Sequence, residues 1–252
     1  MSTPGHESDR TRRHHVRIVE QEQISDGVYY LRVERPFDFL PGQCIAMAMS
    51  QISPARYYSL ASDPADTEIG ILYDLVPGGA LTPHLSRLRS GESVWLSDPF
   101  GTFVDDEGPA VWIATGTGVA PFLSRARSLA GDILRSRKWL IHGGRTNDRF
   151  YFGQELTRRM PDRFLRCCSQ CEPSLLPAGS TGRDEFDPIK LPEAGLYRGR
   201  LTVWLTQALA ARIFEEGSRF LLCGSAGMVV NVRDMLIAAG IPFDRILSEI
   251  YF

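Results

Sequence analysis

Residues 110–114, Ala-Val-Trp-Ile-Ala, constrain the fold most because they are apolar at every position. Strands that are apolar throughout are typical of parallel sheets covered on both faces. A glycine-bearing turn follows at residues 115–121, and the pattern after it predicts a helix from about residue 122 to 130. Strand and helix patterns then alternate, which predicts a doubly wound parallel α/β sheet. Further strands are expected at residues 138–142, 164–169, 219–223 and 245–251, and further helices at 153–159, 202–211 and 226–239.

The chain before this stretch shows many short strands separated by turns, at residues 16–19, 28–33, 44–49, 69–76 and 94–96, with one more starting at Arg56. Such spacing predicts an antiparallel β-barrel or sandwich that ends near Phe103. One short helix is expected at residues 81–88, with Thr82 as its N-cap and Pro83 in its first position.

These patterns predict three parts. Residues 1–15 are polar and lack the apolar middle of a secretion signal, so we expect a disordered N-terminal tail and a cytoplasmic protein. Residues 16–104 form the β-barrel domain and residues 105–252 the α/β domain. Within the second domain, residues 174–192 are rich in Pro, Gly and Ser and predict an irregular surface loop.

Composition excludes some kinds of partner. The chain of 252 residues is 43% hydrophobic, which is enough for a full core, yet no apolar run is long enough to span a bilayer, so no membrane partner is expected. A net charge of −2 leaves no basic excess, so nucleic acid is not expected as the main partner. A monomer is the default expectation.

The cysteines give no disulfide framework on sequence grounds, because there are five and they are scattered: Cys44, Cys167, Cys168, Cys171 and Cys223. Three of them lie within five residues and invite a metal interpretation. A closed zinc or iron–sulfur site usually takes four ligands, however, and a free cysteine packs well as a small hydrophobic residue. No metal is therefore expected.

The stretch Arg56-Tyr57-Tyr58-Ser59 places a cation, aromatic rings and a hydroxyl side by side. In a strand, Arg56 and Tyr58 face one way, and Tyr57 and Ser59 the other. An arginine fork can bind a diphosphate, and a tyrosine ring beside it can cover a flat heterocycle. The stretch therefore suits a dinucleotide with a large planar ring; a half-buried strand with an edge arginine is the alternative.

Three features follow strands of the predicted parallel sheet, where ligands of such sheets bind. Gly116-Thr117-Gly118 lets backbone N–H groups approach a phosphate at a helix start. Cys223-Gly224 brings a thiol to the same edge, and Arg145 could contact a second phosphate. Each feature also has a simpler explanation: a tight turn, a buried core thiol and a solvated arginine.

In combination these motifs resemble the ferredoxin–NADP⁺ reductase family in its bacterial form, from about residue 16 to residue 252. The family signature R-x-Y-S matches residues 56–59, its second FAD stretch residues 79–85, and its turn G-T-G-x-A-P residues 116–121. The signature C-G-x-x-x-M matches residues 223–228 with one residue of slack, and the ending E-x-Y-aromatic matches residues 249–252. Five motifs in the family's order carry the resemblance.

The resemblance implies a barrel that binds FAD. Arg56 would hold the FAD diphosphate, with Thr82 at the phosphates. Tyr58 would cover one face of the flavin, and Ser59 would lie near its hydride-accepting nitrogen. Tyr251 would cover the other face, and Phe252 would extend toward the adenine side. Further FAD contacts are implied for Tyr57, Tyr73, Leu75, Gly79 and Leu81.

The α/β domain would bind the nicotinamide cofactor. Thr117 and Cys223 would contact the nicotinamide, and Glu249 would lie in the proton path behind Ser59 and Cys223. Catalytic roles are thus implied for Ser59, Cys223, Glu249 and Tyr251, and nucleotide contacts also for Gly116, Gly118, Arg145, Arg200, Gly224 and Met228.

NADPH is favoured over NADH because a 2′-phosphate is usually met by arginine. Arg145 and Arg200, with Arg198 beside it, match the family's phosphate-side arginines. Gln170 is a departure, since it stands where NADPH-preferring members often carry arginine.

The implied activity is electron transfer between NADPH and a ferredoxin or flavodoxin, by hydride transfer to or from FAD. The docking face for this carrier should be basic, with Arg32, Arg35, Arg87 and Arg89 as candidates. Alternatives are an oxygenase reductase component, a free-flavin reductase and a non-enzymatic flavin subunit. Oxygenase reductases often carry an iron–sulfur domain, for which no cysteine set is expected here, and Cys223, Glu249 and Tyr251 argue against a subunit without turnover.

Overall fold

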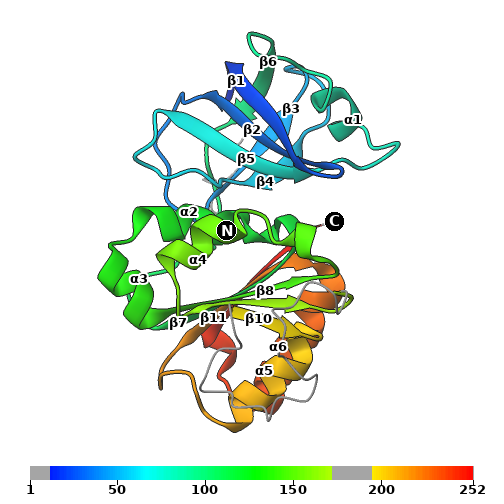
Figure 1. Cartoon of the computed structure of the whole chain (residues 1–252). Helices are drawn as coiled ribbons and strands as arrows, with labels where there is room; N and C mark the ends of the chain where they lie inside the picture. Colours follow the sequence, from blue (N-terminus) through cyan, green and yellow to red (C-terminus); the bar gives the residue numbers. More distant parts are fainter. Residues whose placement is uncertain (1–11, 172–194, 252) are drawn as a thin grey trace, which may run out of the picture. The chain divides into compact units, whose positions relative to one another are not determined.

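The computed structural model describes residues 12–171 and 195–251, which form two compact units (Figure 1). The first unit comprises the described residues up to Asp105 together with Ala120–Ser128. The second comprises Asp106–Val119 and the described residues from Leu129 onward. The surface loop expected at residues 174–192 lies outside the described residues, and no helix of the described part is long and apolar enough to cross a membrane.

The first unit is built on a six-stranded antiparallel sheet in the order β4-β3-β6-β1-β2-β5. Its strands are β1 (Arg13–Ser25), β2 (Val28–Glu34), β3 (Cys44–Ala48), β4 (Arg56–Ser59), β5 (Glu68–Asp74) and β6 (Ser93–Ser97). An antiparallel bridge between Leu60 and Ile71 joins the two ends of this order, and Ala61 N donates to Gly70 O at 2.8 Å beside it. Of the two expected architectures, the structure thus adopts the closed barrel, which leaves no long strand edge exposed.

The barrel core follows the two-residue period of its strands. In β2, Leu31 and Val33 are buried, whereas Tyr30 and Arg32 beside them are only partly buried. Inward-facing residues of the other strands complete one hydrophobic cluster, including Val16, Ile18, Ile45, Met47, Ile69, Ile71, Val94 and Leu96. Strands β3 and β5 are instead buried at nearly every position, so alternation marks only some of the barrel strands.

The predicted N-terminal tail is wrong in its last three residues, because β1 begins at Arg13. Residues 13–15 pair with residues 97, 96 and 95 of β6. His14 Nε2 lies 2.7 Å from Asp98 Oδ1, and the His15 ring packs 4.9 Å from the ring of Trp95. These polar residues form a strand because their backbone groups and side-chain rings contact β6 and Asp98, which lie about 80 residues later in the sequence.

The predicted cap of the short helix is also wrong. Helix α1 (Thr82–Leu85) has Leu81 at its N-cap position, and that position makes no side-chain capping bond. Thr82 Oγ1 instead accepts a hydrogen bond from Val76 N at 2.9 Å. The hydroxyl therefore fixes the turn that leads from β5 into the helix, which has only four residues.

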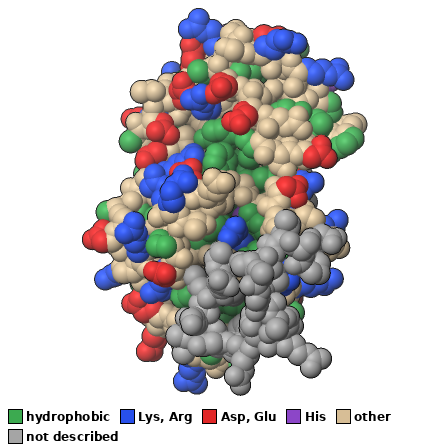
Figure 2. Space-filling view, in the orientation of Figure 1, with side chains coloured by type: hydrophobic (Ala, Val, Ile, Leu, Met, Phe, Trp, Pro, Cys, Tyr) green, Lys and Arg blue, Asp and Glu red, His purple; other side chains and the backbone are tan. Residues whose placement is uncertain are grey.

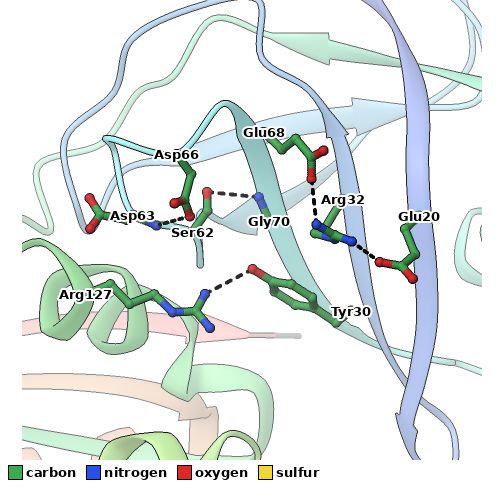
Figure 3. A network of polar contacts seen from close by, with 9 residues as sticks. All are labelled: Glu20, Tyr30, Arg32, Ser62, Asp63, Asp66, Glu68, Gly70 and Arg127. Atoms are coloured by element: carbon green, nitrogen blue, oxygen red, sulfur yellow. Dashed lines mark hydrogen bonds and ion pairs between the residues drawn. The ribbon is translucent and has the colours of Figure 1, made fainter. Parts of the chain in front are cut away.

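Helix α2 (Ala120–Ser128) belongs to the first unit, although the sequence assigns it to the α/β domain. Ser124 Oγ donates to Ser62 O at 2.6 Å. Arg127 Nη1 donates to the hydroxyl of Tyr30 at 3.1 Å, as Figure 3 shows, and it also donates to Ala61 O at 3.0 Å. These bonds connect the helix to β2 and to the segment after β4.

The second unit contains a six-stranded parallel sheet in the order β10-β9-β8-β7-β11-β12. Its strands are β7 (Ala110–Thr115), β8 (Lys138–Gly144), β9 (Phe164–Cys168), β10 (Leu196–Arg198), β11 (Arg219–Ser225) and β12 (Ile246–Tyr251). Its α-helices are α3 (Gly131–Arg137), α4 (Gly153–Arg159), α5 (Leu201–Ala210) and α6 (Ala226–Ala238), and Figure 1 shows α5 and α6 on one face of the sheet. The predicted doubly wound parallel sheet is confirmed.

One strand and one α-helix of the described residues were not predicted, and both are weakly marked in the sequence. Strand β10 has only three residues, and none of them is fully buried. Helix α3 has seven residues, of which only Leu134 is buried, so it shows no apolar stripe. By contrast, α5 buries Leu201, Trp204, Leu205 and Ala208, which is the spacing of one helix face.

The cysteine cluster lies at the end of β9. Cys168 and Cys171 form a disulfide with a Cα–Cα distance of 5.6 Å, which the sequence did not lead us to expect. Cys44, Cys167 and Cys223 are buried and stand outside this bond. Across residues 12–171 and 195–251, no group of three or more His, Cys, Asp or Glu side chains is placed to hold a metal ion.

Candidate functional site

The Arg56–Ser59 stretch forms β4, whose exposure falls along its length. Arg56 and Tyr57 are exposed, Tyr58 is half-buried and Ser59 is buried. The ring of Tyr57 meets that of Phe100 edge-on at 5.4 Å, and the pairing of β4 with β3 sets Ser59 opposite Cys44. The strand thus offers a cation and an aromatic ring at the surface of the barrel.

Behind β4, three tyrosines pack together. The ring of Tyr58 meets Tyr73 edge-on at 6.3 Å, and Tyr73 stacks on Tyr29 at 5.3 Å. Tyr73 is only 2% exposed, and its hydroxyl donates to Gln21 Oε1 at 2.8 Å. Burial raises the pKa of Tyr58 to about 12, so this ring stays neutral. Tyr73, a predicted cofactor contact, therefore lies in the barrel core and backs Tyr58.

The second predicted FAD stretch, residues 79–85, forms the end of the turn after β5 together with α1. Gly79 N donates to Val76 O at 2.9 Å, and Leu75 N donates to Gly27 O at 2.7 Å. Leu81 and Thr82 are buried, whereas Gly79 is partly exposed. The turn is tied on both sides, so its partly exposed backbone at Gly79 is held in place.

In the second unit, the glycine turn lies at the topological switch point. The 3-10 turn η1 (Gly116–Val119) follows β7. In the sheet, strands β8, β9 and β10 lie on one side of β7, and strands β11 and β12 lie on the other. Ligands of open α/β sheets bind at such a point. A Cβ at Gly116 would meet nothing within 4 Å, so the space beside this residue is open.

The turn requires glycine at its third residue. A Cβ added at Gly118 would lie 2.7 Å from the Cα of Gly224 and closer still to the carbonyl of Cys223. Gly224 has a φ of +139° and passes just as close to Thr115. The ends of β7 and β11 therefore meet backbone to backbone, and Gly118 and Gly224 are explained by packing.

His142 was not singled out in the sequence, although it holds this turn. Its side chain on β8 is completely buried, and its Nε2 lies 3.1 Å from the carbonyl oxygen of Gly116. Burial lowers its pKa to about 4, so the ring is neutral and its Nε2–H donates to that oxygen. The available signal was a histidine directly after the apolar residues 139–141 of the predicted strand.

The structure brings Cys223, Glu249 and Tyr251 to one edge of the sheet. Cys223 is fully buried on β11 and stands in register with Ala114 on one side and with Glu249 on the other. Tyr251 lies opposite Ser225 at the end of β12, and both Glu249 and Tyr251 are half-buried. Met228 instead packs inside the core on α6. Phe252 lies outside the described residues.

The predicted phosphate arginines follow neighbouring strands. Arg145 is exposed after β8, and Arg198 and Arg200 are exposed at and just beyond the end of β10. Gln170 N donates to Arg145 O at 2.8 Å, and Gly199 N donates to Cys168 O at 2.8 Å. The segment after β9 thereby links the two segments that carry these arginines.

Two domain families match the chain. Residues 15–104 match the oxidoreductase FAD-binding domain, and residues 112–174 match the oxidoreductase NAD-binding domain.

Two named relatives match nearly the whole chain, and a third matches just over half of it. A ferredoxin–NAD(P)⁺ reductase component of naphthalene 1,2-dioxygenase and salicylate 5-hydroxylase systems from Ralstonia sp. is 31% identical over 98% of this chain and 73% of that protein. A flavodoxin/ferredoxin–NADP reductase from Rhodobacter capsulatus is 28% identical over 89% and 85%. The match to a naphthalene 1,2-dioxygenase reductase component from Pseudomonas putida, at 34% identity, spans 58% of this chain and 46% of that protein.

Solved structures agree in fold. A ferredoxin NADP⁺ reductase from Neisseria gonorrhoeae superposes with a TM-score of 0.71 at 21% identity, over 95% of this chain and 99% of the other. The cytochrome P450 reductase GcoB of Amycolatopsis gives 0.72 at 25% identity, over 95% and 69%. On these domain matches and whole-chain relatives, the protein belongs to the ferredoxin–NADP⁺ reductase family of oxidoreductases, with an FAD-binding and an NAD(P)-binding domain.

Proposed function

We propose that this protein is an FAD-dependent reductase that passes electrons between NADPH and a one-electron carrier protein, a ferredoxin or a flavodoxin. The observation that carries the proposal is the close approach of the Gly116–Val119 turn to the backbone of Cys223 and Gly224 at the switch point of the parallel sheet, with Glu249 in register with Cys223. The relatives named ferredoxin–NADP reductases in Rhodobacter capsulatus and Sorangium cellulosum, each 28% identical, support the same activity.

The second unit fits a nicotinamide dinucleotide. The open side of Gly116 leaves room for a phosphate beside the η1 turn, and Thr117 follows it. Exposed Arg145 and Arg200 could neutralise phosphates farther along the sheet edge. Thr117 and Cys223 would hold the nicotinamide, and Arg145 and Arg200 the 2′-phosphate, which favours NADPH.

The barrel fits FAD. Arg56 is exposed, suits a diphosphate, and stands next to the rings of Tyr57 and Tyr58. Gly79 offers a partly exposed backbone for a second phosphate contact. When bound, FAD accepts a hydride and returns its electrons one at a time. Tyr58 would orient the ring system, and Ser59 would donate a hydrogen bond to it.

Glu249 is our candidate for holding a proton near the reacting atoms. It stands in register with Cys223, and it is half-buried, so it could exchange protons with solvent. Cys223 is fully buried and cannot do so directly. In this proposal Cys223 positions the nicotinamide, Tyr251 covers the flavin until the nicotinamide enters, and Glu249 moves protons.

The carrier would dock on a local basic surface. Figure 2 shows Lys and Arg side chains interspersed with Asp and Glu over the face in view. Electrostatic attraction of an acidic carrier would therefore have to come from a smaller basic patch. Arg32 pairs with Glu20 and Glu68, and Arg35 pairs with Asp38. Of the four candidates, Arg87 and Arg89 are exposed and are the ones we retain.

A second candidate function is the reductase component of an oxygenase. The Ralstonia relative, which at 31% identity covers 98% of this chain, carries that description and uses NAD(P)⁺ by name. Gln170, in place of an arginine, would suit NADH as the donor. The carrier would then be the oxygenase's own electron-transfer protein.

Anaerobic mixing of the purified holoprotein with NADPH and, separately, NADH tests the proposal. We expect the flavin absorbance to bleach faster with NADPH, and the variants Arg145→Gln and Arg200→Gln to slow bleaching by NADPH but not by NADH. Faster bleaching by NADH would favour the oxygenase component. A flavin that neither nucleotide bleaches would contradict both candidates and leave an electron-transfer subunit without nicotinamide turnover.

A further inference from the structure

The disulfide at the end of β9 closes a four-residue turn, Cys168-Ser169-Gln170-Cys171. Cys168 is 1% exposed, whereas Cys171 is half-buried and reachable from solvent. Two cysteines separated by two residues are the usual spacing of sites that exchange between disulfide and dithiol. Neither the activity proposed above nor the relatives assigns a role to this pair.

The turn rests on the segment that follows β8. Ser169 N donates to Gly144 O at 3.0 Å, and Gln170 N donates to Arg145 O at 2.8 Å. On its other side, Gly199 N donates to Cys168 O at 2.8 Å, next to Arg198 and Arg200. A change in the turn is therefore transmitted to both segments that carry the predicted phosphate arginines.

Both sulfur atoms lie beside acceptor oxygens. Cys168 Sγ is 3.3 Å from the carbonyl oxygen of Arg145, and Cys171 Sγ is 3.2 Å from Asn147 Oδ1. A disulfide sulfur has no hydrogen to donate, but a thiol has one. Reduction would therefore create two S–H donors that already face acceptors on the Arg145–Asn147 segment, so the dithiol form has partners of its own.

Cys167 does not compete for this bond. It is 1% exposed and packs in the sheet core, where burial raises the pKa of its thiol. A neutral buried thiol is a poor nucleophile, and Cys167 remains a free thiol while Cys168 is bonded to Cys171, so the exchanging pair is Cys168 and Cys171.

We propose that Cys168 and Cys171 form a reversible redox site, reduced by a dithiol compound or protein, whose state sets the affinity of the second unit for NADP(H). This inference rests on the proposed function, since it concerns the same nucleotide. A thiolate of the dithiol attacks the accessible Cys171 Sγ, and Cys168 leaves as a thiolate that takes up a proton. The second thiol of the dithiol then displaces Cys171. Two electrons and two protons pass to the protein, and the dithiol becomes a disulfide.

The test begins with the thiols of the full-length holoprotein. Alkylation after denaturation, with and without prior dithiothreitol, should modify two more cysteines in the reduced sample, and peptide mapping should place both at 168 and 171. Equal alkylation in the two samples would overturn the inference.

Calorimetric titration with NADP⁺ then measures affinity in each redox state. We expect roughly fivefold tighter binding by the oxidised protein, because the closed turn holds the Arg145 segment in place before the nucleotide arrives. Cys171→Ser should bind like the reduced protein in both buffers, and Cys44→Ala, which removes a thiol from the barrel, should keep the difference. Equal affinities in the two states would overturn the redox inference alone. Failure of both states to bind NADP⁺ would contradict the proposed function as well.

Discussion

The residue whose chemistry depends most on its surroundings is His142. It is fully buried, its Nε2–H donates to Gly116 O, and its Nδ1 has no hydrogen-bond partner in the described part of the chain. A charged imidazole is disfavoured in such a place, because burial removes the water that would solvate it. The histidine therefore supports the nucleotide turn only in its neutral form.

This gives a prediction for stability against pH. The pKa of His142 is lowered to about 4, and an unfolded histidine has a pKa of about 6.5. The unfolded state thus binds a proton first as the pH falls, and the free energy of unfolding should drop by roughly 3 kcal/mol between pH 6.5 and pH 4 from this group alone. Urea unfolding at several pH values measures the effect.

The matched variant is His142→Gln, whose amide nitrogen can reach a similar position and does not titrate. Its free energy of unfolding should fall less steeply over the same pH range than that of the parent protein. An identical slope for both proteins would show that His142 does not titrate as described.

Gly118 is the second residue with a sharp expectation. Gly118→Ala would place a Cβ against the backbone of Cys223 and Gly224, and backbone cannot move aside as a side chain can. We expect the free energy of unfolding to fall by about 2 kcal/mol or more and NADP⁺ to bind more weakly. Gly131→Ala is the control, because a Cβ there meets nothing within 4 Å. Equal stability of the two variants, measured by thermal unfolding, would refute the close approach.

At the scale of elements, the turn into α1 depends on the hydroxyl of the helix's own first residue, Thr82. Thr82→Val keeps the shape of the side chain but removes the acceptor for Val76 N. Val76 is exposed, so its N–H can bond to water once the acceptor is lost; the free energy of unfolding of Thr82→Val should fall by about 0.5–1.5 kcal/mol, the net contribution of one hydrogen bond, while Thr82→Ser is much less affected. Chemical unfolding monitored by flavin release would detect the difference, and equal losses in both variants would exclude the hydrogen bond as the cause.

The attachment of α2 to the barrel is a second prediction at this scale. Arg127 donates hydrogen bonds to the Tyr30 hydroxyl and to Ala61 O. Arg127→Met removes both hydrogen bonds, whereas Tyr30→Phe removes only the first. A double-mutant cycle should therefore give a coupling energy of about 1 kcal/mol between the two positions. A coupling near zero would mean that the pair drawn in Figure 3 adds nothing to stability.

At the scale of the whole molecule, the net charge of −2 leaves little long-range attraction for an acidic carrier. A local basic surface at Arg87 and Arg89 would have to supply it. The double variant Arg87→Glu/Arg89→Glu should lower kcat/KM for a flavodoxin about tenfold at low ionic strength, and less as salt is added. Turnover with a small quinone should stay unchanged. Arg137→Glu, an exposed arginine on α3, is the control; an equal loss there would indicate a general charge effect instead of docking.

Much of this molecule is determined locally. The short, turn-separated strands of the first 100 residues predicted an antiparallel barrel or sandwich, and the apolar stretch at residues 110–114 predicted a parallel sheet covered on both faces. Glycine at residues 116 and 118 and the following helix pattern placed a turn at the sheet edge, since few other residues tolerate that backbone. The family motifs depend on the same local features.

Only the tertiary structure decided what needs a distant partner. Residues 13–15 become strand because they pair with β6, and Thr82 leaves its capping role because Val76 N lies beside its hydroxyl. His142 becomes neutral because it is buried beside Gly116, and Cys168 bonds to Cys171 on a turn held by Gly144 and Arg145. A side chain's propensity is set within a few residues of sequence, whereas its pKa, its hydrogen-bond partner and its oxidation state are set by the atoms that folding brings against it.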